Sequence, residues 1–182
     1  MRHGKVAIDD TETVDAVSLK KWIEAYDAAP LARDVPPPKE SLLTAKESDV
    51  VVCSTLRRSA DSATLLHVTC KEKNPLFDEI RIPKIAIPLL RLKVKHWLVL
   101  SRVMMLLGLT KKEDSLKSVA KQAASAAQRL TALSQQCDSV LLVGHGAMNW
   151  MIGKALLRQG WHKKTRSAHS HWGMTLFEHP SG

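Results

Sequence analysis

Residues 140–146 read Val-Leu-Leu-Val-Gly-His-Gly, a short apolar run that ends at a histidine between two glycines. A compact apolar run of this length, bounded by glycine, predicts a buried β-strand. A second run, Val50-Val51-Val52-Cys53, is also followed directly by a polar segment, Ser54 to Arg58. Because parallel strands end at the same edge of a sheet, we expect the polar segments after the two strands to lie close together.

Apolar residues at helical spacing occupy most of the remaining chain. We predict helices over 18–29, with Ser18 as N-cap, and over 54–66, 97–107, 114–137 and 148–159, with a shorter helical stretch near 41–45. Further strands are expected at 67–70 and 174–178, and an extended segment at 90–94. Strands that alternate with helices predict an α/β domain with a mainly parallel central sheet.

Charge is unevenly distributed along the 182 residues, whose net charge is +9. Residues 1–79 carry 11 basic and 14 acidic side chains, whereas residues 80–112 carry eight basic and no acidic ones. The length fits a single domain over 1–182. We expect the basic and apolar segment 80–112 to cap a pocket that takes an anionic ligand.

The apolar runs and the cysteines bear on location. No apolar run approaches the roughly 20 residues of a membrane-spanning helix. The three cysteines, Cys53, Cys70 and Cys137, are odd in number and far apart in sequence. This pattern favours free, buried thiols in a reducing compartment, so we predict a cytoplasmic protein.

Four short motifs bring together the residues that are capable of chemistry. In chain order they are Arg2-His3-Gly4, Ser54-Thr55-Leu56-Arg57-Arg58, Leu76-Phe77-Asp78-Glu79 and Gly144-His145-Gly146. In their order and spacing across the chain, these motifs resemble those of the histidine phosphatase superfamily, also called the phosphoglycerate mutase-like family. The resemblance implies a three-layer α/β/α fold and a phosphatase that needs no metal and no cofactor.

The resemblance also assigns a role to each candidate site residue. His3 is expected to be the nucleophile that forms a phosphohistidine. Arg2 and Arg58 are expected to bind the phosphate oxygens, and His145 to add a donor that stabilises the transferring group. Glu79 matches the residue that protonates the leaving group and then activates water, with Asp78 as the alternative. The expected substrate is a small phosphomonoester or a phosphohistidine protein.

The start of the chain departs from the family pattern. Members of the family place a hydrophobic strand before Arg-His-Gly, whereas only Met1 precedes Arg2 here. We therefore expect the sheet to lack its first strand and the loop that carries His3 to be untethered. We also expect the reading frame upstream of Met1 to encode a short apolar run.

Other functions remain open at the level of sequence. A phosphoanion-binding module could keep the arginines without turnover. Residues 80–112 could instead contact an anionic membrane surface or, less favourably, nucleic acid, since the chain has only one tyrosine and two phenylalanines for base stacking. The pair His169 and His171 could bind a metal, but no cysteine or aspartate lies near in sequence to complete a site.

Overall fold

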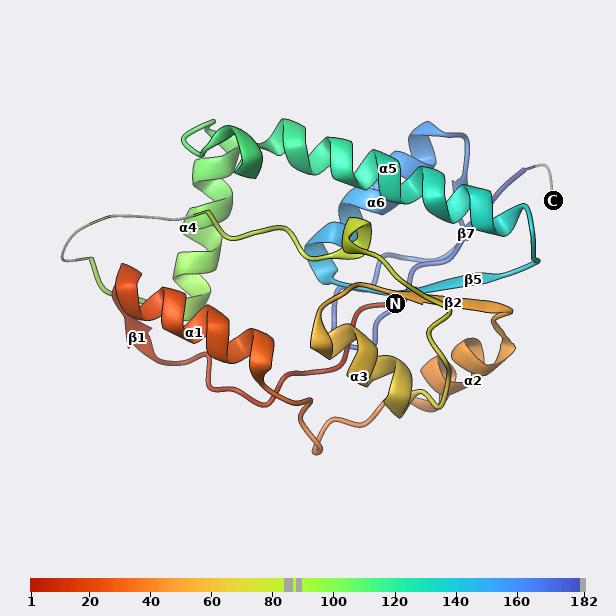
Figure 1. Ribbon diagram of the computed structural model, residues 1–182, viewed down its shortest axis with the longest axis horizontal. Helices are drawn as coiled ribbons and strands as arrows, with labels where there is room; N and C mark the ends of the chain where they lie inside the picture. The colour runs from red at the N-terminus through yellow and green to blue at the C-terminus, as the bar shows by residue number, and fades with distance from the viewer. Residues whose placement is uncertain (84–86, 88–89, 181–182) are drawn as a thin grey trace.

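A computed structural model describes residues 1–83, 87 and 90–180, and over these residues the fold is mixed α/β (Figure 1). The described residues form a three-stranded parallel sheet and six α-helices. The helices are α1 (Ala16–Ala28), α2 (Lys39–Glu47), α3 (Arg57–Leu65), α4 (Val94–Leu106), α5 (Leu116–Ser134) and α6 (Gly146–Arg158). No helix in this described part is both long and apolar enough to cross a membrane.

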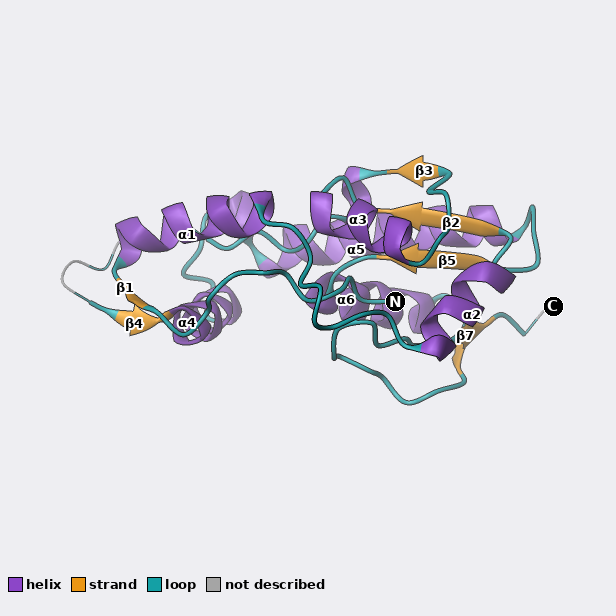
Figure 2. Cartoon of the chain, turned by 90° about the horizontal axis from the view of Figure 1, so that it is seen from below, coloured by secondary structure: helices purple, strands orange, loops and turns teal. Residues whose placement is uncertain are grey.

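The central sheet has the strand order β3-β2-β5, seen side by side in Figure 2. β2 (Val50–Cys53) and β5 (Val140–Val143) pair in parallel over their full length, and β3 (Glu72–Lys73) pairs in parallel with the end of β2. Both long strands have the predicted bounds. Their side chains are apolar at successive positions because both faces of the sheet are covered.

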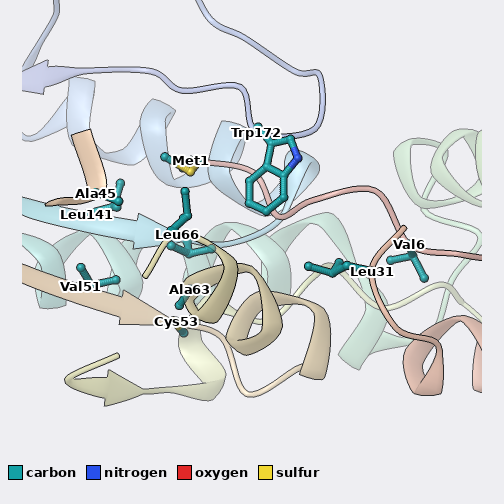
Figure 3. Close-up of a cluster of buried hydrophobic side chains, with 11 residues drawn as sticks. Met1, Val6, Leu31, Ala45, Val51, Cys53, Ala63, Leu66, Leu141 and Trp172 are labelled. Carbon is teal, nitrogen blue, oxygen red and sulfur yellow. The ribbon is translucent and has the colours of Figure 1, made fainter. Parts of the chain in front are cut away.

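Each face of the sheet packs against its own pair of helices. Val51 and Leu141 point to a cluster completed by Ala45 of α2 and Ala63 of α3 (Figure 3). On the opposite face, the cluster around the strands is completed by apolar residues of α5 and α6: Ala123, Ala126, Ala127, Met148, Ile152 and Ala155. The small residues of α5 let this helix lie close to α6.

Residues 1–3 lie beside the end of β5 and are held on two sides. Gly144 donates its N–H to Met1 O at 3.0 Å, and the N–H of His3 donates to Gly144 O at 2.9 Å. On the other side, Arg2 N donates to Gly173 O at 2.9 Å and Trp172 N donates to Arg2 O at 3.1 Å. The expectation of an untethered His3 loop is therefore wrong. Residues 1–3 form no regular strand, but Arg2 forms an isolated parallel β-bridge with Gly144 at the end of β5.

A separate small core joins α1 and α4. β1 (Thr13–Val14) pairs antiparallel with β4 (Leu92–Lys93), and Leu19 of α1 packs with the fully buried Trp97 of α4. Trp97 Nε1 donates to Val14 O at 2.8 Å, which satisfies its buried N–H. These elements lie beside the central sheet rather than over its faces (Figures 1 and 2).

Three local predictions are corrected by the structure. Residues 67–70 form no strand, because His67 takes a left-handed conformation with φ of 59° just after α3 and the chain pairs with β2 only from Glu72. α1 begins at Ala16, and its N-cap is Asp15, whose carboxylate accepts from Ser18 N at 2.7 Å. In 174–178 only β7 (Phe177–Glu178) is a strand, and it pairs antiparallel with β6 (His162–Lys163) outside the central sheet.

The cysteines also differ from the prediction. Cys53, at the end of β2, forms a disulfide with Cys70 in the segment that leads to β3. Cys137 is free. The prediction of free thiols is therefore wrong for Cys53 and Cys70. The chain reverses direction after α3 and brings Cys70 next to Cys53, although the two are 17 residues apart in sequence.

Candidate active site

Three of the four motifs meet at the carboxyl edge of the central sheet. His3 lies in the segment beside the end of β5, His145 follows β5 itself, and Arg58 lies in the first turn of α3 after β2. The rings of His3 and His145 have centroids 5.1 Å apart. Arg58 Nε lies 3.3 Å from Nδ1 of His145. The parallel pairing of β2 and β5 explains why segments about 90 residues apart converge.

His3 is buried, and its hydrogen bonding defines its tautomer. Its Nδ1 lies 2.7 Å from the carbonyl oxygen of Gly4. A carbonyl oxygen only accepts, so Nδ1 carries the proton and Nε2 holds the lone pair. Burial lowers the pKa of His3 to about 3, helped by Arg58 and Arg2 and opposed by the bond to Gly4. His3 is therefore a neutral imidazole at neutral pH.

His145 is fully buried and both of its ring nitrogens have partners. Arg58 Nε donates to Nδ1, so the proton of the neutral ring is on Nε2, which lies 2.6 Å from Ser54 Oγ. Burial lowers the pKa of His145 far below its usual range, and the charge of Arg58 acts in the same direction. The N–H of His145 is thus bound to Ser54, and it would have to leave Ser54 to donate to an anion.

Arg58 is held by α1 as well as by His145. Its Nη1 lies 2.6 Å from Oδ1 of Asp27, and its Cζ lies 4.9 Å from the centroid of the Tyr26 ring. Its side chain is only 5% exposed, whereas that of Asp27 is 46% exposed. Arg57 instead points outward, where Nε donates to Asp61 Oδ2 at 3.1 Å. Of the two arginines, Arg58 is the one beside the histidines.

Arg2 has a donor that the described protein atoms leave unused. Its Nη1 donates to the carbonyl oxygen of His169 at 2.5 Å. Its Nε is buried and has no hydrogen-bond partner. A buried N–H without a partner is costly, so an oxygen supplied by a bound anion would stabilise this position.

Asp78 and Glu79 are neighbours in sequence with different surroundings. The carboxylate of Asp78 accepts from Thr55 N at 2.7 Å and from Thr55 Oγ1, which ties two loops together. Glu79 Oε1 accepts from Ile80 N at 2.9 Å and from Met148 N, in the first turn of α6, at 3.2 Å. Asp78 therefore binds the loop after β2, whereas Glu79 binds the start of α6.

A pocket of about 460 Å3 opens beside Arg2. Seven residues line it: Arg2, Glu79, Arg102, Gly146, Ala147, Trp150 and His169. The sequence left open whether Glu79 or Asp78 is the candidate proton donor. Glu79 lines the pocket and Asp78 does not. Arg102 belongs to α4, so the basic segment contributes one positive charge to the pocket wall.

His171 is a site residue that the sequence interpretation missed. Its ring centroid lies 5.5 Å from that of His3, and its Nδ1 donates to His3 O at 3.1 Å. Burial lowers its pKa, as does the charge of Arg2. From the sequence, His169 and His171 are candidates only for a metal site. Over the described residues, no group of three or more potential ligands is placed to hold a metal ion.

A steric restriction explains why Gly4, the glycine of the first motif, has no side chain. A Cβ on Gly4 would overlap the ring of Trp172, whose backbone is in the left-handed region with φ of 63°. A tryptophan rarely adopts this conformation, which costs energy and is often found near functional sites. Residues 171–173 thus pack directly on Arg2-His3-Gly4 and fix the position of His3.

Comparison with known proteins gives one distant likeness. No family model matches the chain, and no curated protein is similar to it in sequence at a significant level. Among solved structures, that of the open reading frame Rv3214 from Mycobacterium tuberculosis is similar to 87% of this chain and 77% of that chain, with 20% identity and a TM-score of 0.46. The family of the chain therefore rests on its own residues and stands as a proposal.

Proposed function

We propose that the chain is a metal-independent phosphoric monoester hydrolase of the histidine phosphatase type, which acts through a phosphohistidine at His3. The observation that carries this proposal is the bond from His3 Nδ1 to Gly4 O. It leaves the lone pair on Nε2 of a neutral ring, which is the form of histidine that can attack phosphorus. Arg2 and Glu79 line the pocket, whereas His3 is buried behind its wall, so substrate binding would have to expose Nε2 of His3.

The proposed reaction has two steps. Nε2 of His3 attacks phosphorus in line, the bond from phosphorus to the ester oxygen breaks, and the leaving alkoxide takes a proton from Glu79. Glu79 then accepts a proton from water, whose oxygen attacks the phosphohistidine. The second step releases inorganic phosphate and restores the neutral His3. No oxidant, metal or cofactor enters the balance.

The positive charges beside His3 would bind the three equatorial oxygens of the transferring group. The Nε of Arg2 is buried without a partner, so a shift of this side chain into the pocket would give the donor an oxygen of the phosphate. Arg58 is oriented by Asp27 and His145, which reduces the entropy it loses on binding. The first turn of α6 adds the positive end of a helix dipole near the same place.

The layer arrangement, the domain extent, the substrate class and the cellular location belong to the same proposal. Burial of both sheet faces by helices supports a three-layer α/β/α arrangement. One domain over 1–182 with residues 80–112 as its cap belongs to the proposal, and its support is Arg102 of α4 in the pocket wall. The expected substrate is a small phosphomonoester or a phosphohistidine protein. A cytoplasmic location stays a prediction, and the disulfide Cys53–Cys70 removes the argument from free thiols that supported it.

The test is direct capture of the intermediate. The purified chain is incubated briefly with an aryl phosphate, quenched in base and analysed by mass spectrometry, since a phosphohistidine is labile in acid. We expect one phosphate on the peptide that contains His3. Phosphate on a serine or cysteine, or turnover with no phosphate on His3 at any quench time, would contradict the proposal.

Substitution of Glu79 should lower turnover, whereas substitution of Asp78 should lower stability. Glu79→Gln keeps an oxygen for Met148 N but removes the proton, so turnover of an alkyl phosphate is expected to fall by roughly 10²-fold or more. An aryl phosphate, whose phenolate leaves without a proton, should be affected less. Asp78→Asn should instead lower the free energy of unfolding by about 1–2 kcal/mol through weaker bonds to Thr55.

Initial rates with both substrates and urea unfolding of each variant check this prediction. Equal losses of turnover in both variants, after correction for the folded fraction, would assign the proton to neither acid.

A second function is favoured by one specific feature. The N–H of His145 is bound to Ser54 and the guanidinium of Arg58 is paired with Asp27. A site whose donors are committed in this way could bind a phosphoanion without turning it over. Such a module would bind inorganic phosphate at Arg2 by calorimetry, and neither the chain nor its His3 variants would hydrolyse an aryl phosphate.

A further inference from the structure

The outer side of α4 and the turn after it expose a continuous apolar surface. Five side chains form it, each between 43% and 68% exposed, and together we name them the α4 apolar patch: Val99, Val103, Leu106, Leu107 and Leu109. The inner side of the same helix is buried through Val94, Trp97 and Met105. A helix that is apolar on both sides is normally covered on both sides, so the outer side indicates a binding partner.

Basic side chains border the patch. Lys95 and Arg102 are exposed on α4, and Lys111 and Lys112 are exposed just after the turn. The sequence from 80 to 112 contains no acidic residue, and the first acids beyond it are at 113 and 114. Exposed leucines flanked by lysines suit the boundary of a lipid bilayer, where acyl chains meet anionic headgroups.

Charge decides between a membrane and a second copy of the chain. Two copies joined through this surface would bring together the basic side chains that border the patch on each copy: Lys95, Arg102, Lys111 and Lys112. An acidic lipid surface instead supplies the opposite charge to these four side chains. We propose that α4 and the turn through Leu109 form a docking surface for an anionic lipid bilayer.

Docking in this way would place the candidate active site near the lipid surface. Arg102, on the same helix as the patch, also lines the pocket beside Arg2. The proposal does not depend on the proposed hydrolase activity, because binding to lipid is measured without substrate. Arg102 is left unchanged in the variants below so that the pocket keeps its charge.

Vesicle flotation tests the docking surface with the full chain. We expect the chain to float with vesicles that mix phosphatidylserine and phosphatidylcholine and to stay behind with pure phosphatidylcholine. Serine at Val103, Leu106 and Leu109 together should lower the partition coefficient about tenfold or more, because the apolar contribution is lost. The triple variant Lys95→Gln, Lys111→Gln and Lys112→Gln should lower it by up to about fivefold for each lysine and weaken its dependence on salt.

A matched control replaces three leucines that are equally exposed on other elements. Leu43, Leu157 and Leu176 changed together to serine should leave flotation unchanged. Circular dichroism checks that each variant is folded. Absence of flotation, equal flotation with both vesicle types, or the same loss in the control variant would overturn the proposal. A concentration-dependent dimer that the α4 serine variant abolishes, without flotation, would overturn it in favour of a second copy.

Discussion

Replacing His3 with asparagine is expected to lower the turnover of an aryl phosphate by roughly 10³-fold or more, because the nucleophile is lost. Asparagine is the sharpest choice because its side-chain N–H can still donate to Gly4 O, as Nδ1 of His3 does. The fold around the site is then preserved while the lone pair at the Nε2 position disappears. Steady-state rates at saturating substrate measure the effect.

His67 offers a matched control for this substitution. It is exposed, remote from the histidine cluster and in the left-handed region at φ of 59°, a conformation that asparagine also accepts. His67→Asn should therefore keep both turnover and stability. Equal turnover in wild-type chain and His3→Asn would exclude a phosphohistidine at His3. Phosphate binding without turnover in either chain would instead support the phosphoanion-binding alternative.

The parts of the fold that sequence predicted well are those determined by local pattern. β2 and β5 matched their predicted bounds because a strand covered on both faces must be apolar at every position. The long helix α5 also followed its pattern, with Ser115 as N-cap. Once these strands were parallel, the meeting of the Arg58 and His145 loops followed from topology.

The parts that sequence missed depend on contacts between distant segments. No local pattern reveals that His67 turns left-handed, or that the reversal beyond it brings Cys70 to Cys53. The tether of Arg2 depends on backbone groups of residues 144 and 172–173, and backbone pairing leaves no mark on side-chain identity. The expectation of an untethered His3 loop is wrong for this reason.

The residues of the candidate site also fall into those that the sequence predicted and those that it missed. The motif pattern supplied His3, Arg58 and His145, which the structure brings together. It did not supply Asp27, which pairs with Arg58 from α1, or His171, which donates to His3 O. A lone carboxylate on a helix and a histidine in a loop carry no recognisable signal until the chain is folded.

Stability should fall steeply in mild acid, because the buried histidines are neutral in the folded chain. An unfolded His3 titrates near 6.5, whereas burial lowers its pKa to about 3 in the fold. Between these values the unfolded chain binds more protons than the folded chain, so the free energy of unfolding decreases as pH falls. The contribution of His3 is complete above pH 6.5 and is lost progressively toward pH 3. His145 acts in the same direction.

Each such histidine contributes a slope of about 1.4 kcal/mol per pH unit within its window. Urea unfolding between about pH 6.5 and pH 5 measures it above the range in which carboxylates such as Glu72, whose pKa Arg129 lowers, begin to contribute. His3→Asn should have a slope smaller by about 1 kcal/mol per pH unit than wild-type chain. The difference between the two chains cancels shared groups, including the Met1 amino group, whose pKa burial lowers to about 5.

His67→Asn again supplies the comparison, because this exposed histidine should leave the slope unchanged. If His3→Asn and His67→Asn have the same slope as wild-type chain, then His3 gains a proton in the folded state without cost. A protonated ring has no lone pair on Nε2 and cannot attack phosphorus, so that result would also remove the physical basis for His3 as nucleophile in mild acid. The pH dependence of stability and the loss of turnover thus test one property, the neutral ring held by Gly4.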